Sequence, residues 1–151
     1  MSPPSGDAAS HSTGPPDRQT LQLLERQFAS NSLVKETSFD PDSYEPRLLR
    51  ATLDPGRYPR SIATARVDIR WFTTGDFSMH YVEDHDDETW ECRWDRHPNP
   101  HNARLHFHEP PRAESVTDLS LCSLHPLEVY PTVLAAIEQR IETLWQPRYS
   151  Q

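Results

Sequence analysis

Two stretches of alternating large apolar residues, joined by an acidic turn, constrain the fold of this chain more than any other feature. The alternating positions are Phe77, Met79, Tyr81, Trp90, Cys92 and Trp94. A period of two is typical of a β-strand that buries one face. We therefore predict an antiparallel hairpin with an aromatic buried face and a turn within residues 83–88.

The pairing of these two strands decides which side chains meet. The register that we predict opposes Tyr81 to Trp90 and continues in steps of two along the buried face. On the other face it sets His80 across from Glu91. The buried side of the hairpin is therefore aromatic, and the open side carries groups that titrate or donate hydrogen bonds.

A third alternating run precedes the hairpin. Its apolar positions are Ala63, Ala65, Val67, Ile69 and Trp71. With a turn over residues 73–76, Trp71 opposes Phe77, so one apolar face extends across three strands. The opposite face then gathers polar and charged side chains: Arg66, Asp68, Arg70, His80, Glu91, Arg93 and Asp95.

Shorter runs extend this sheet on both sides. Residues 33–39 and 47–53 favour strands and are separated by a turn-rich segment. After two prolines at positions 98 and 100, residues 104–108 form a short strand on which His106 and His108 project to the same side. We interpret residues 112–125 as a long connection.

Two helices complete the predicted domain. Asp17 is a suitable N-cap for a helix that ends at about Asn31. The last helix covers about Leu127–Trp145, and its apolar stripe is Tyr130, Leu134, Ile137, Ile141 and Leu144.

We predict one α+β domain over residues 17–146: an N-terminal helix, a mainly antiparallel, strongly twisted sheet of about four to six strands, and a C-terminal amphipathic helix packed on the aromatic face. Residues 1–16 are rich in proline, serine and glycine and are predicted to be a disordered tail, with a second tail over 147–151.

Composition narrows the class of protein. The chain has 151 residues, no apolar run of membrane-spanning length and no signal-like segment, so we expect a cytoplasmic protein without a membrane partner. Its net charge is −8, and Lys35 is its one lysine, a pattern typical of salt-adapted proteins, although a GC-rich genome alone also favours arginine over lysine. Cys92 and Cys122 lack metal-ligand spacing and are predicted to be reduced thiols.

Seven of the eight histidines lie between His80 and His125, which raises the question of a shared task. Imidazole titrates near neutral pH and suits general acid–base chemistry. Metal-free RNA cleavage needs a base, an acid and a cation for the phosphorane charge. The candidates are His80, His106 and His108 for protons, Arg70 and Arg93 for phosphate charge, and Asp95 to orient a histidine.

Two other interpretations of the histidines remain open. In one, His106 and His108 bind a zinc ion, with a loop histidine (His97 or His101) or Asp95 as the third ligand, although the spacing matches no standard structural zinc signature. In the other, each histidine has a structural role and pairs with a nearby carboxylate. The leading hypothesis uses no metal and no cofactor.

Several short motifs follow one another in this region: His80-Tyr81, the acidic turn over 83–88, Arg93-Trp94-Asp95, His97-Pro98 and His106-x-His108. In this order the sequence resembles the TumE-like toxins of toxin–antitoxin systems, over roughly residues 60–108. The resemblance implies a small α+β toxin-like protein with an antitoxin encoded beside it. The leading hypothesis is a toxin-like component of a toxin–antitoxin system, for which RNA cleavage by the His/Arg face is the candidate activity. The alternatives are a non-catalytic protein-binding module on the same face and a metal-binding regulatory protein.

Overall fold

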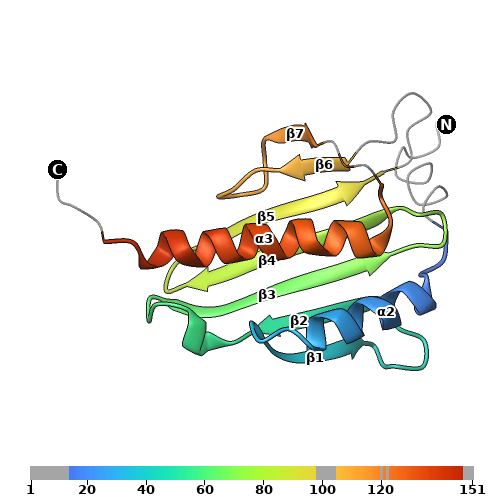
Figure 1. Ribbon diagram of the computed structural model, residues 1–151, viewed down its shortest axis with the longest axis horizontal. Coiled ribbons are helices and arrows are strands. Elements are labelled where there is room, and N and C mark those ends of the chain that lie inside the picture. Colours follow the sequence, from blue (N-terminus) through green and yellow to red (C-terminus); the bar gives the residue numbers. More distant parts are fainter. Residues whose placement is uncertain (1–13, 98–104, 120, 122, 148–151) are drawn as a thin grey trace, which may run out of the picture.

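The computed structural model describes residues 14–97, 105–119, 121 and 123–147. Within them the chain forms an antiparallel meander whose spatial order equals its sequence order, β1 to β7. The strands are β1 (Val34–Asp40), β2 (Leu48–Leu53), β3 (Ile62–Trp71), β4 (Phe77–His85), β5 (Thr89–Arg96), β6 (Leu105–His108) and β7 (Val116–Leu119). Both helices, α2 (Arg18–Ala29) and α3 (Pro126–Trp145), lie on one face of this sheet (Figure 1). The α+β class and the two helices are confirmed.

The predicted number of strands was wrong, because the sheet has seven strands among the described residues. The strand that was not predicted is β7, which lies inside the segment interpreted as a long connection. It pairs with β6, Val116 opposite His108 and Leu119 opposite Leu105. Three of its four residues are exposed, since it is an edge strand without a buried face. It therefore lacks the alternation by which a half-buried strand is recognised.

The pairing of β3 with β4 follows the prediction, with Trp71 opposite Phe77 and their rings stacked at 4.3 Å. The predicted register of β4 with β5 was wrong by two residues: Tyr81 faces Cys92, and Glu83 faces Trp90. The cause is that β4 continues to His85, inside the predicted turn. A shift of two residues keeps every side chain on its predicted face.

The N-terminal helix begins as predicted. The Asp17 side chain accepts a hydrogen bond from the Thr20 backbone nitrogen at 3.1 Å and so caps α2. The helix buries Leu21, Leu24 and Phe28 against the sheet. Just before it, the Thr73 nitrogen donates to the Pro15 carbonyl at 2.9 Å. The rest of the predicted N-terminal tail, residues 1–13, lies outside the described residues. Residues 148–151 of the predicted C-terminal tail also lie outside them.

The C-terminal helix covers the aromatic face, as predicted. All five positions of its apolar stripe are buried or packed against the core. Full burial of one such side chain contributes about 1.5–3 kcal/mol to stability. Tyr130 also joins the two helices: its ring meets Phe28 edge-on at 4.9 Å, and its hydroxyl donates to the Gln27 carbonyl at 3.0 Å. Neither described helix is long and apolar enough to cross a membrane.

Candidate functional site

The face of the sheet opposite the helices carries the predicted site residues. Both helices pack on the other side, so this face is uncovered by either of them (Figure 1). Cross-strand neighbours point to the same face of a sheet. Two rows cross β4, β5 and β6: His80, Arg93 and His108 in one, and Ser78, Asp95 and His106 in the other.

Asp95 is the centre of the closest cluster on this face. Its Oδ2 lies 2.9 Å from Arg93 Nε, 2.9 Å from His108 Nε2 and 3.3 Å from His97 Nε2. The side chain is 1% exposed, although it lies on the open face, because these neighbours cover it. Its Oδ1 is buried and has no hydrogen-bond partner among the described residues. The carboxylate thus fixes three cationic or titratable groups around one oxygen.

Arg93 lies over the imidazole of His108. Its Nη2 is 3.3 Å from both ring nitrogens of His108, which places the guanidinium above the ring face rather than in the ring plane. In the plane of the ring, His108 Nε2 therefore faces Asp95, and Nδ1 can form a hydrogen bond with another group. Such stacking holds a cation beside a histidine that can still exchange a proton.

The surroundings of His108 favour its neutral form. Burial lowers the pKa of His108 below its usual value, and the Arg93 charge lowers it further, although Asp95 acts in the opposite direction. In the neutral ring only one nitrogen carries a proton, and Asp95 at Nε2 selects that nitrogen as the donor. The Nδ1 atom is then the proton acceptor, as a general base requires.

The other two predicted histidines pair with separate carboxylates. His80 Nε2 lies 2.6 Å from Glu91 Oε1, and His106 Nε2 lies 3.4 Å from Asp118 Oδ1. The structure therefore does not gather His80, His106 and His108 around one acid. It does bring His80 and His108 to the two sides of Arg93, as cross-strand neighbours.

Arg70 is the outlying member of the predicted set. It lies near the end of β3, opposite Ser78, and its side chain is exposed. Its side chain makes no hydrogen bond or ion pair within the described part of the chain. Arg66, the other arginine on this face of β3, instead pairs with Asp68 at 3.3 Å and Asp84 at 3.4 Å.

The metal hypothesis has no support from the described geometry. Among the described residues, no group of three or more His, Cys, Asp or Glu side chains is arranged to hold a metal ion. His101, one of the proposed ligands, lies outside those residues.

A second polar network lies under α3, and none of its residues belongs to the predicted site. The Glu83 carboxylate is fully buried and accepts from Arg140 Nε and Nη2, both at 2.8 Å, and from the Tyr81 hydroxyl at 2.7 Å. His85 Nε2 lies 3.1 Å from the same carboxylate. The Tyr81 hydroxyl also meets that of Tyr58 at 2.8 Å, and burial raises the pKa of both phenols.

The signal for this network was present in the spacing. Glu83 follows Tyr81 by two residues and so belongs to the buried face of the same strand. Arg140 follows Ile137 by three residues and so extends the apolar stripe of α3. Assigning residues 83–88 to a turn hid this pairing.

Comparison with known proteins identifies a family but no individual curated protein or solved structure. No curated protein and no solved structure matches this chain. The sequence model of the family described as Toxin TumE matches residues 21–141. The match is wider than the likeness over residues 60–108, and it extends from α2 into the last turns of α3. Because the match covers most of the chain, the protein belongs to the Toxin TumE family.

Proposed function

We propose that this protein is the toxin of a toxin–antitoxin pair and that it cleaves RNA without a metal ion. Membership in the Toxin TumE family supports the toxin role and a co-encoded antitoxin partner. The observation that carries the chemistry is the row His80, Arg93 and His108 across three neighbouring strands. A co-encoded partner and an RNA target both agree with the cytoplasmic location that we expect.

The row supplies the three groups that RNA cleavage requires. His108 Nδ1 takes the proton of the ribose 2′-hydroxyl, and the 2′-oxygen then forms a bond to phosphorus. The bond from phosphorus to the 5′-oxygen breaks, and His80 gives that oxygen a proton. His80 must therefore start this step as the imidazolium, whose charge Glu91 balances. Arg93, between the two histidines, stabilises the negative charge of the phosphorane.

The remaining predicted residues have supporting roles in this proposal. Asp95 fixes the protonated nitrogen of His108 and holds Arg93 in place. Arg70 and His106 lie at the margins of the same face, where Arg70 can contact a neighbouring phosphate of the RNA. His106 is the less suited of the histidines to proton transfer, since Arg93 is not its cross-strand neighbour.

Growth measurements and RNA integrity together test this function. Expression of the chain alone should arrest growth, and co-expression of the adjacent gene should restore it. His108→Gln and His80→Gln should each relieve the arrest and abolish cleavage of RNA by the purified protein in EDTA. Arg50→Gln, an exposed arginine on the same face paired with Asp68, is the matched control and should leave both unchanged. Full toxicity of both histidine variants would refute the proposal.

A second candidate function has one specific observation in its favour. Each of the three predicted histidines already faces a carboxylate, so the open face is balanced in charge rather than basic. Such a surface suits a protein partner better than a polyanion. If the purified protein binds the product of the adjacent gene but leaves RNA intact, a non-catalytic binding module becomes the better description.

A further inference from the structure

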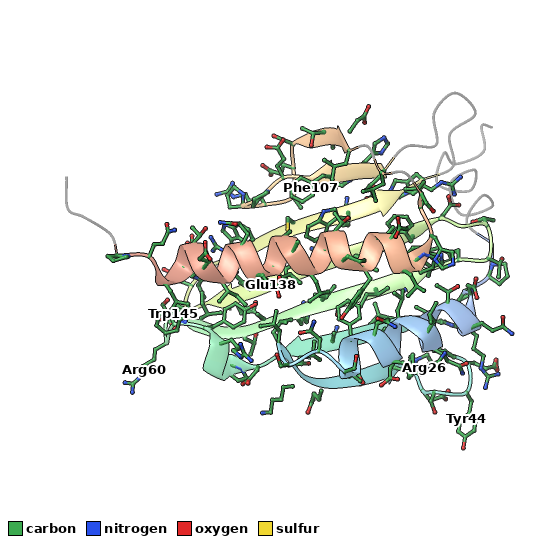
Figure 2. All side chains as sticks on the ribbon, in the orientation of Figure 1. Arg26, Tyr44, Arg60, Phe107, Glu138 and Trp145 are labelled. Atoms are coloured by element: carbon green, nitrogen blue, oxygen red, sulfur yellow. The ribbon has the colours of Figure 1, made fainter. Side chains whose placement is uncertain are left out.

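A groove on the helical side of the sheet has no role in the proposed chemistry. It runs between α3 and strands β4 to β6, and its apolar part has a volume of about 290 Å³. The residues that define it are Trp90, Cys92, Trp94, Phe107, Ala136 and Ile137. Figure 2 places one of them, Phe107, on β6 beside α3. An open apolar hollow beside a packed core is typical of a surface that another molecule completes.

The groove continues into a polar hollow of about 700 Å³ toward the β4–β5 turn. The two hollows share Trp90, Arg140 and Thr143, so they form one surface. Arg140 lies over the Trp90 ring, 3.6 Å from its centroid, and is anchored by Glu83, which makes this shared wall rigid. His85 and Glu88 line the polar end.

The polar end of the groove is negatively charged on the side of the β4–β5 turn. Asp86, Asp87 and Glu88 form an exposed acidic turn beside it. The charge of Arg140 is already balanced by Glu83. The last turn of α3 ends over the same end of the sheet (Figure 1) and carries no basic residue, so its free carbonyl groups add negative potential.

We propose that this groove is the docking site of the antitoxin, and that the antitoxin segment inserts apolar side chains beside Trp90 and places a lysine or arginine against the acidic turn. This inference rests on the proposed toxin function. Charge complementarity selects the occupant: RNA would be repelled from the acidic end. A second copy of this chain, with net charge −8, would also be repelled.

Binding of the purified full-length chain to the purified product of the adjacent gene tests the groove. Ala136→Phe fills the apolar part, and Ala135→Phe, on the exposed side of the same helix, is its matched control. Asp86→Lys with Asp87→Lys reverses the acidic turn, and Glu36→Lys with Glu45→Lys makes the same charge change on distant exposed sites. Calorimetric titration should show about tenfold or greater weakening in both groove variants and little change in the controls.

The outcomes separate this inference from the proposed function. Equal affinity of groove and control variants would overturn the groove and leave the toxin function standing. Absence of binding by the wild-type chain would overturn both. If Ala136→Phe unfolds the protein, Thr143→Trp at the exposed rim replaces it and must show the same loss. A wild-type dimer by light scattering that either groove variant dissociates would assign the groove to a second copy and overturn the antitoxin.

Discussion

Arg140 on α3 and Glu83 on β4 form a bidentate ion pair, with both nitrogen–oxygen distances at 2.8 Å. Glu83 is fully buried, and the Tyr81 hydroxyl donates to the same carboxylate. This pair fixes the rotation of the C-terminal helix on the sheet, because a guanidinium that meets both carboxylate oxygens tolerates little displacement. The helix position in turn defines the groove beside Trp90.

Removing the charge of Glu83 should destabilise the protein strongly. Glu83→Gln leaves the Arg140 guanidinium largely buried without its counter-ion, and the expected loss in free energy of unfolding is about 3–5 kcal/mol. Urea unfolding followed by tryptophan fluorescence measures it. Glu142→Gln, an exposed glutamate on the same helix, should change stability by less than about 0.5 kcal/mol.

A second substitution tests whether the loss comes from the unpaired charge. Glu83→Gln combined with Arg140→Met removes both charges and should recover a large part of the stability. If the double variant is as unstable as the sum of the two single variants, the two side chains do not act as a pair.

The fold followed from the sequence wherever one face of an element is buried. Trp71 opposite Phe77, the cap at Asp17 and the stripe of α3 all produce a periodic pattern that can be read without coordinates. β7 could not be found in this way, because an exposed edge strand pairs through its backbone and leaves no pattern in its side chains.

The face of the sheet that carries the candidate site could be predicted from the sequence, but the contacts between its side chains could not. The two-residue period places His80, Arg93 and His108 on one side of the sheet in any register that differs by an even number of residues. Which of them are neighbours depends on the register, and a shift of two residues replaced Glu91 by Arg93 as the cross-strand partner of His80. The pairing of Glu83 with Arg140 joins residues 57 positions apart, which no local pattern encodes.

The stability contributed by His108 should depend on pH. Its pKa is lowered on folding, so below the usual value of 6.5 the unfolded chain binds the proton more readily, and stability falls as pH falls. His108→Gln should therefore reduce the loss of stability between pH 7.5 and pH 5.5 by roughly 1 kcal/mol or less. Urea unfolding at several pH values measures the difference. A variant with the same pH dependence as the wild type would contradict the lowered pKa.

The Cys92 thiol should be unreactive in the folded protein. Burial, together with the nearby Glu83 charge, raises its pKa to about 12, so the thiolate is scarce at pH 8. In a Cys122→Ser background, which leaves Cys92 as the one thiol, reaction with a disulfide reagent should be slower than in urea by about 100-fold or more. Rapid labelling without urea would show that the strand under α3 opens in the native state.

Neutralising Asp95 tests whether this carboxylate orients the His108 ring in the proposed site. Asp95→Asn keeps the size of the side chain but replaces an acceptor of His108 and Arg93 with an amide. An amide nitrogen toward His108 Nε2 would favour the tautomer whose proton is on Nδ1, so the proposed base would be lost. RNA cleavage should fall by about 10²-fold or more.

The comparison for this substitution is Glu91 on the same strand, β5. Glu91→Gln alters only the partner of His80, which we propose as the acid, and leaves the Asp95 contact of His108 in place. Asp95→Asn removes the acceptor that sets the His108 tautomer, so its loss of RNA cleavage should be the larger of the two. Rates of RNA cleavage by the two purified variants at the same pH measure the difference. An equal or smaller loss in Asp95→Asn would contradict the assigned role of Asp95.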